Sequence, residues 1–238
     1  MKISLNFKDV FYQELIKEGV YDPAIFKVIF MAGGPGSGKS YVAGRTTKGL
    51  GYRVVNSDKP FEMILNKVNI GGKGAKLDKM NDEEYAQAQD IRGNRAVPLT
   101  GRMQQTYIEG RLGIIVDGTG ADYNRIVKQV TELRELGYDA YMIFVNTSLD
   151  VAQERNQNRK RSLPPDVVED SWRSAQSNMG RFQGLFGSSN FVIVDNDNAG
   201  EDVFKKVWKY IMNFTKKKIK NPIAKKWMDM ELAKKRRD

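Results

Sequence analysis

The 238-residue chain contains no cysteine and no histidine. Disulfide bonds, thiolate nucleophiles and metal sites built from these two residue types are therefore excluded. A general base would have to be a carboxylate, a lysine or a tyrosine. A bound metal would need oxygen ligands, which favours ions such as Mg²⁺. No apolar run reaches the roughly 18 residues of a membrane-spanning helix, and the first 20 residues lack the apolar core of a signal peptide. We therefore expect a cytoplasmic protein that does not bind membranes.

The net charge of +10 arises entirely from the C-terminal segment. Residues 1–204 contain 26 basic and 26 acidic side chains, whereas residues 205–238 contain 13 basic and three acidic ones. A neutral body with a basic tail suggests a polyanionic partner, and the alternative is a solvated helical face. We therefore divide the chain into a domain over residues 1–204 and a basic helical extension over residues 205–238.

Five short apolar runs alternate with segments long enough for helices. This alternation is typical of an α/β fold with buried parallel strands, in which the carboxyl ends of the strands form the ligand crevice. The connection at residues 59–111 is unusually long and contains a polar helical stretch that we expect to break near Pro98. Because connections of this length usually have a function, we expect it to bind the acceptor. The five runs lie at residues 26–32, 52–56, 112–117, 140–146 and 190–194.

A glycine-rich loop follows the first apolar run. The segment Gly33–Ser40 matches the pattern G-x-x-x-x-G-K-[ST]. In this pattern backbone N–H groups surround phosphate oxygens, the lysine reaches the β- and γ-phosphates, and the hydroxyl binds Mg²⁺. The alternative is an ordinary glycine-rich turn between a strand and a helix. We expect ATP to bind at Gly34, Pro35, Gly36, Ser37, Gly38, Lys39, Ser40 and Tyr41.

Two acidic residues and two arginines complete the predicted site. Asp58 follows the second run and is the candidate general base, although it could instead cap a helix or a turn. Asp117 ends the third run at the position of a Mg²⁺-binding aspartate, and it could instead touch the acceptor. Arg155 and Arg159 are four residues apart, which places both on one helix face. We expect them to form a lid over residues 155–165 that binds ATP and stabilises the transferred phosphoryl group. The alternative is a solvated helix end.

These motifs, in this order, resemble kinase-type P-loop proteins. The loop is similar to the GxPGSGKS loop of phage polynucleotide 5′-hydroxyl kinase domains, and Asn56-Ser57-Asp58 is similar to their N-x-D base motif. The segment Arg155–Val167 resembles their lid, R-N-x-x-R followed by V-P-x-D-V. Zeta-toxin kinases and phage kinases of hydroxymethyl bases in DNA have a similar core. One departure is that no arginine closely follows Asp58, whereas these families commonly have one there to hold the acceptor.

The resemblance implies a three-layer fold with a five-stranded parallel sheet in the order 2-3-1-4-5. It also implies ATP- and Mg²⁺-dependent phosphoryl transfer to an alcohol group. The expected acceptor is a hydroxyl on nucleic acid, either at a 5′ end or on a hydroxymethylated base, with DNA expected rather than RNA. We expect the basic tail to contact it partly, as in phage nucleic-acid modification or repair in the host cytoplasm. Two alternatives stay open, a zeta-toxin-like kinase of a nucleotide sugar of the UDP-N-acetylglucosamine type and a non-catalytic NTP-binding module. No obligate protein partner is implied.

Overall fold

Five parallel strands form one sheet at the centre of the computed structural model, which describes residues 19–71, 77–159 and 162–236. The strand order β2-β3-β1-β4-β5 confirms the predicted topology. Every side chain of β1 is buried, because helices cover both faces of a parallel sheet. Residues 1–18, most of the segment that lacks a signal-peptide core, lie outside the described residues. The strands are β1 (Lys27–Ala32), β2 (Arg53–Val55), β3 (Ile114–Asp117), β4 (Asp139–Asn146) and β5 (Phe191–Asp195).

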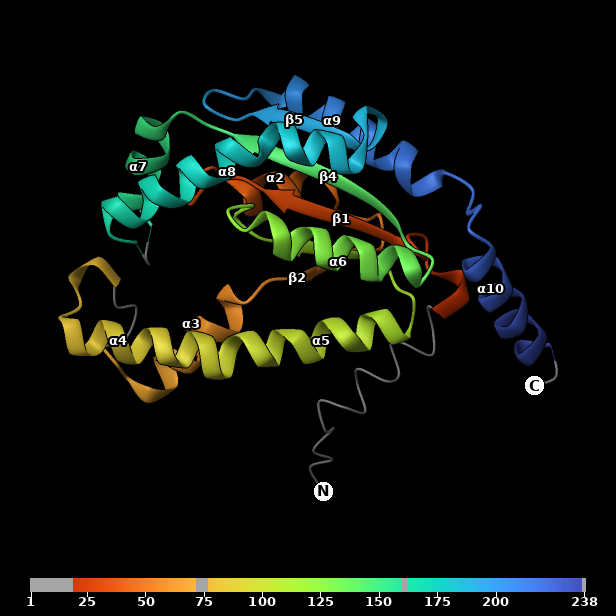
Figure 1. Cartoon of the computed structure of the whole chain (residues 1–238), viewed down its shortest axis with the longest axis horizontal. Coiled ribbons are helices and arrows are strands. Elements are labelled where there is room, and N and C mark those ends of the chain that lie inside the picture. The colour runs from red at the N-terminus through yellow and green to blue at the C-terminus, as the bar shows by residue number, and fades with distance from the viewer. Residues whose placement is uncertain (1–18, 72–76, 160–161, 237–238) are drawn as a thin grey trace.

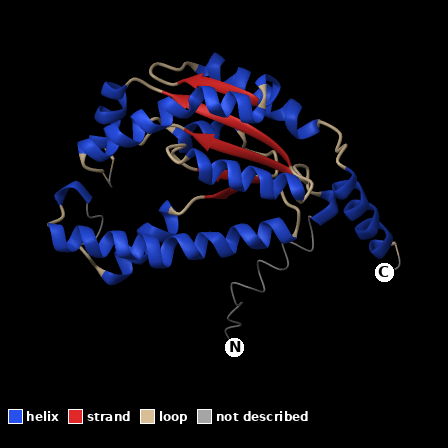
Figure 2. Ribbon diagram, viewed as in Figure 1, coloured by secondary structure: helices blue, strands red, loops and turns tan. Residues whose placement is uncertain are grey.

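The sheet separates two hydrophobic clusters, which confirms the predicted three layers (Figures 1 and 2). One cluster joins the sheet to α2 and α9, and the other joins it to α6 and α8. The remaining helix of the core, α7, follows the carboxyl end of β4. The bounds are α2 (Lys39–Thr46), α6 (Tyr123–Glu135), α7 (Leu149–Gln157), α8 (Pro165–Phe186) and α9 (Glu201–Lys216), with the short turns η1 (Gly19–Tyr21) and η4 (Ser188–Asn190).

The long connection between β2 and β3 folds into helices with a small core of their own. Phe61, Leu65 and Ile91 belong to this core, and Leu163 from the segment after α7 packs against it. The predicted break near Pro98 is wrong, because the chain passes from α4 to α5 through a π-helical turn. Proline lacks an N–H and its ring clashes with the carbonyl four residues earlier, and a wider turn accommodates both effects. The elements are α3 (Asp58–Val68), η2 (Leu77–Lys79), α4 (Asp82–Ile91), η3 (Arg92–Ala96) and α5 (Val97–Glu109).

The basic C-terminal segment is docked on the body. Val207, Ile211 and Phe214 of α9 are buried, as its amphipathic pattern predicts. The second helix, α10 (Pro222–Lys235), packs near the amino ends of the strands. There the Trp227 ring meets the ring of Phe26, with the centroids 5.5 Å apart. The lysines of this segment therefore lie on helices that pack against the rest of the domain, and on the connection between these helices. Across the described residues, no helix combines the length and the apolar character that crossing a membrane requires.

Candidate active site

The glycine-rich loop joins β1 to α2 at the carboxyl edge of the sheet, where we expected the ligand crevice. Gly36 has φ +81°, and a Cβ atom there would lie 2.1 Å from the carbonyl oxygen of Ala152. A side chain is therefore excluded both by the backbone conformation and by the close approach of α7. Lys39 Nζ donates hydrogen bonds to the carbonyl oxygens of Gly33 and Gly34, at 2.7 and 3.0 Å. The loop thus curls around its own lysine, as a phosphate-binding loop does.

Two residues far along the chain hold this loop in place. Asn196, buried after β5, donates from Nδ2 to the carbonyl oxygen of Ser37 at 2.8 Å. Trp172 on α8 contacts the loop so closely that a Cβ atom on Gly34 would lie 3.1 Å from its Cα. Neither residue was part of the predicted site, because a lone asparagine or tryptophan carries no pattern that points to a phosphate loop.

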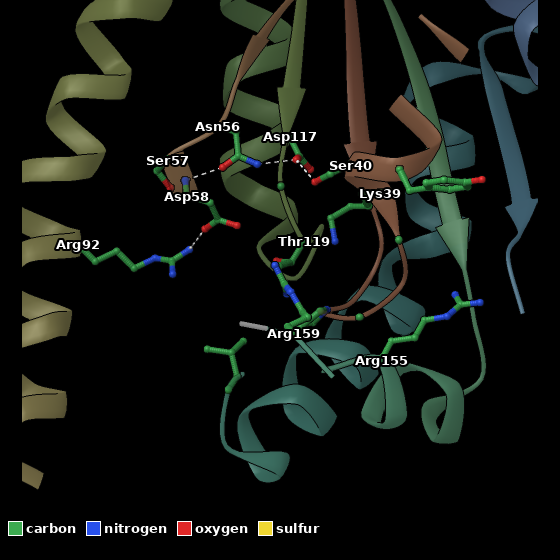
Figure 3. Close-up of a pocket in the computed structure, with 16 residues that line it drawn as sticks. Lys39, Ser40, Asn56, Ser57, Asp58, Arg92, Asp117, Thr119, Arg155 and Arg159 are labelled. Carbon is green, nitrogen blue, oxygen red and sulfur yellow. Dashed lines mark hydrogen bonds and ion pairs between the residues drawn. The ribbon is translucent and has the colours of Figure 1, made fainter. Parts of the chain in front are cut away.

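Asn56 bonds both the Asp117 carboxylate and the backbone of Asp58 (Figure 3). Its Nδ2 donates to Asp117 Oδ2 at 2.5 Å, and its Oδ1 accepts the backbone N–H of Asp58, also at 2.5 Å. Asp58 is the first residue of α3, where the positive end of the helix dipole stabilises a carboxylate. The N-x-D segment therefore orients the candidate base and the candidate metal ligand together.

Asp117 has the character of a metal ligand. Its Oδ2 also lies 3.5 Å from Ser40 Oγ, while its Oδ1 is buried without a hydrogen-bond partner in the described part of the chain. Burial raises the pKa of this carboxyl above its usual range, against the opposing effect of Lys39. A cation beside Oδ1 would supply the missing partner, and the oxygen donors of Ser40 and Asp117 suit Mg²⁺. No cluster of three or more acidic side chains that could hold a metal occurs among the described residues, so phosphate oxygens and water would complete such a coordination shell.

Lys39 lies among both acids and the lid. Burial lowers its pKa, and the charge of Arg159 acts in the same direction, whereas Asp117 and Asp58 raise it. These influences show that the lysine, both carboxylates and Arg159 share one electrostatic environment. Such a concentration of interacting charges in a cavity is typical of an active site.

Arg92 is the functional candidate that the sequence did not reveal. Its Nη2 lies 3.0 Å from Asp58 Oδ1, and each of the two side chains is 34 % exposed. Its guanidinium also lies over the ring of Phe61, 5.2 Å from the centroid. An arginine thus contacts Asp58 although none closely follows it in the sequence, and this arginine is the first residue of the π-helical turn. Such turns are often found at functional sites, and Pro98, just after this one, was the available signal in the sequence.

The two predicted lid arginines differ in their surroundings. Because α7 ends at Gln157, Arg159 lies beyond the helix, and the expectation that both arginines share one helix face is wrong. Arg155 donates from Nη2 to the carbonyl oxygen of Asp197 at 2.9 Å, and its Nη1 is buried without a partner among the described residues. In Figure 3 the Arg159 guanidinium lies near Thr119, whereas Arg155 points away from Lys39.

One cavity of about 320 Å³ collects most of the predicted site, and its volume is within the range of small-ligand pockets. Tyr41 lines it as well, with its ring packed edge-on against Phe204. The cavity also contains the unpredicted residues Arg92 and Thr119. Of the predicted ATP and metal residues, Gly34 and Ser37 of the loop do not line this cavity. The lining includes Pro35, Gly36, Gly38, Lys39, Ser40, Tyr41, Asp58, Asp117, Arg155 and Arg159.

Two solved structures show how similar the fold of this chain is to known folds. The chain superimposes on a structure of the PezAT chromosomal toxin-antitoxin system of Streptococcus pneumoniae with a TM-score of 0.54 at 10% identity, covering 91% of this chain and 100% of that one. The structure of AvrRxo1-ORF1:-ORF2 with ATP gives a TM-score of 0.52 at 14% identity, covering 84% of this chain and 72% of that one. At these identities the likeness concerns the fold.

Sequence comparison leads to a family. Adenylate kinase isoenzyme 5 of Bos taurus is 29% identical over 141 residues, which is 58% of this chain and 23% of that protein. The chain thus matches less than a quarter of that relative's length. Residues 28–182, more than half of the chain, match the AAA_33 family, an AAA domain. This match spans the loop, both carboxylates and the lid arginines. The chain therefore belongs to the AAA_33 family and has the fold of the kinase-type P-loop proteins.

Proposed function

We propose that the protein is an ATP- and Mg²⁺-dependent kinase that transfers the γ-phosphate to an alcohol group. The observation that carries this proposal is the cavity in which Lys39, Asp58 and Asp117 meet. A protein that only binds NTP needs the loop and a metal ligand, but it does not need a second carboxylate beside them that is contacted by an arginine, as Asp58 is by Arg92. The second carboxylate is what phosphoryl transfer to a hydroxyl requires, because a base must accept the hydroxyl proton.

In the proposed reaction Asp58 accepts the proton of the acceptor hydroxyl while the oxygen attacks the γ-phosphorus. The bond between this phosphorus and the β,γ-bridging oxygen breaks, ADP leaves, and Asp58 later releases its proton to water. Lys39 and Arg159 stabilise the negative charge of the transferred group. Asp117 and Ser40 would hold Mg²⁺, which neutralises charge on the phosphate oxygens when it is bound.

For the acceptor we propose a hydroxyl on nucleic acid, at a 5′ end or on a hydroxymethylated base, with DNA preferred over RNA. The motifs shared with polynucleotide kinase domains support this choice. A nucleotide sugar is the second candidate. It is favoured by the position of the lysine-rich α10, which packs near the amino ends of the strands while the cavity lies at their carboxyl ends. The pocket itself would then have to recognise the acceptor.

The basic segment remains a proposed secondary contact for nucleic acid. Lys217, Lys218 and Lys220 are exposed in the connection between α9 and α10. A strand that reached both this connection and the cavity would have to run along the body. Deleting the segment would also remove Trp227 and the buried Ala224 from the core. Substitutions that neutralise the lysines are therefore the appropriate test of this contact.

The experiment uses γ-labelled ATP with separate pools of DNA, RNA and nucleotide sugars, and follows which pool becomes labelled. We expect Lys39→Ala to abolish labelling, and Asp58→Asn to lower turnover by about 10²–10⁴ while ATP still binds. Lys48→Ala and Glu62→Gln are matched controls, because both side chains are exposed on or near the same helices. If Asp58→Asn transfers phosphate at the rate of the unmodified protein, Asp58 is not the base. If no hydroxyl acceptor is labelled, the protein is not this kinase.

A further inference from the structure

A second cavity adjoins the proposed reaction centre. It has a volume of about 390 Å³ and lies between α5 of the long connection and α6 of the core. We call it the α5–α6 groove. It shares part of its lining with the ATP cavity, so the two spaces meet beside Asp117 and Arg92. The shared residues are Ser57, Arg92, Asp117, Gly118 and Thr119.

The position of the groove suits an acceptor. In the proposed reaction the donor phosphates occupy the side of the site formed by the glycine-rich loop. The acceptor oxygen must therefore approach Asp58 from another side, because attack and departure occur roughly in line. Arg92 borders both cavities and contacts Asp58 at 3.0 Å. Asp58 itself lines only the ATP cavity, so the acceptor hydroxyl would reach it where the two spaces meet, past Ser57 and Arg92.

The lining of the groove includes side-chain amides, a hydroxyl and the guanidinium of Arg125. Gln104 and Thr100 come from α5, and Gln129 comes from α6. Arg125, also on α6, is exposed, and its guanidinium has no hydrogen-bond or ion-pair partner among the described residues. The acid closest to it in sequence, Asp122, caps α6 by accepting the backbone N–H of Arg125 at 3.0 Å.

These groups match the parts of a nucleotide. Glutamine side chains offer paired donors and acceptors to the edge of a base or to sugar hydroxyls. Arginine binds phosphate through two parallel hydrogen bonds. The apolar floor, which includes Val55, Val116 and Ile126, suits the face of a ring.

We propose that the α5–α6 groove binds the acceptor as one phosphate-bearing nucleotide unit, with Arg125 holding the phosphate and Gln104 and Gln129 contacting the base or sugar. This inference rests on the proposed kinase function and deepens it. The unit can be a residue of a nucleic acid strand or the nucleotide part of a nucleotide sugar, since both present the same chemistry. Arg125 thereby becomes a residue that determines specificity.

The test measures equilibrium binding to the whole protein in the presence of Mg²⁺ and a non-hydrolysable ATP analogue, so it does not depend on turnover. The first probe pair is a 5′-hydroxyl oligodeoxynucleotide and the same oligomer with a neutral methylphosphonate at its first linkage. The second pair is UDP-N-acetylglucosamine and N-acetylglucosamine. Arg125→Gln is compared with Lys128→Gln, which removes the same charge from the same helix at a side chain that is 78% exposed and does not line the groove.

We expect the unmodified protein and Lys128→Gln to bind the charged member of one pair at least about tenfold more tightly than its neutral partner. Arg125→Gln should bind the two oligonucleotides within about threefold of each other. It should lower the preference for UDP-N-acetylglucosamine over N-acetylglucosamine by about tenfold, because the glutamine contacts to the base or sugar remain. Circular dichroism should show that the variant is folded. The pair that shows this preference identifies the source of the nucleotide.

Equal loss of preference in Lys128→Gln would overturn the inference, because the effect would then be general electrostatics. Full preference in Arg125→Gln, or no binding of any probe, would overturn it too. Failure of the proposed kinase function would appear in the separate assay with γ-labelled ATP. The probes would then bind with the expected preference in the present test but would not become labelled in that assay.

Discussion

Replacing Asp117 by asparagine should stabilise the protein and at the same time remove its response to Mg²⁺. Burial raises the pKa of this carboxyl, which means that the folded protein disfavours its ionised form. The substitution keeps the shape and an oxygen that can accept the hydrogen bond from Asn56, but it removes a charge whose Oδ1 has no partner among the described residues. Such a conflict between stability and activity is common at functional sites.

The magnitude follows from the balance of two effects. An unpartnered buried polar atom costs about 1–3 kcal/mol, and more when it is charged. The uncharged Nδ2 of asparagine would replace Oδ1 and would be equally unpartnered, so the substitution removes only the additional cost of burying a charge, and the lost attraction between Asp117 and Lys39 offsets part of this gain. We therefore expect a net gain of about 1 kcal/mol, which corresponds to a rise in Tm of about 2–4 °C for a chain of this size. Saturating ligand at about 100 times its Kd adds about 2.7 kcal/mol to the unmodified protein. The Mg²⁺-dependent part of this addition should disappear in Asp117→Asn.

The pH dependence of the stability gain provides an internal check. An unfolded aspartate has a pKa of about 3.9, and the folded value is higher. The unmodified protein therefore loses stability through this group as the pH rises from about 4 through the folded pKa. The advantage of Asp117→Asn should be full at high pH and should vanish at acidic pH.

Differential scanning calorimetry at several pH values, with ATP alone and with ATP and Mg²⁺, measures all of these effects. A lower Tm for Asp117→Asn at neutral pH would refute the stability argument. An unchanged response to Mg²⁺ would refute the assignment of Asp117 as a metal ligand.

Two further predictions concern the loop and the basic segment. Gly36→Ala should destabilise the fold by about 2 kcal/mol or more, because its Cβ would clash with the carbonyl oxygen of Ala152. Thermal melting measures this loss, with Gly44→Ala as the control, since the added Cβ there meets no atom within 4 Å. Equal Tm values for the two variants would contradict the prediction. Combined replacement of Lys217, Lys218 and Lys220 by glutamine should weaken the salt dependence of single-strand DNA binding. The slope of log affinity against log salt concentration should become shallower by about 2, given about 0.7 per phosphate contact. An unchanged slope would show that these lysines form only a solvated face.

The sequence alone determined the parts of this protein that depend on neighbouring residues. The glycine-rich loop is a continuous segment in which backbone N–H groups, Lys39 and Ser40 are adjacent in the chain, so its pattern is sufficient to predict its geometry. The strands were equally predictable, because continuous apolar runs between helical segments have few alternatives to a buried parallel sheet. The strand order was predicted correctly from the family resemblance, since run lengths alone do not specify it.

Only the tertiary structure decided which distant side chains complete the site. Arg92 reaches Asp58 across 34 residues of chain, and Asn196 reaches Ser37 across 159. Each of these contacts depends on how whole helices pack on the sheet, and Arg92 depends further on a π-helical turn that shifts the phase of one helix. Local pattern carries no information about such packing, because the free energy that selects it comes from burying surfaces contributed by separate segments. For the same reason the groove between α5 and α6 became visible only once the long connection was folded against the core.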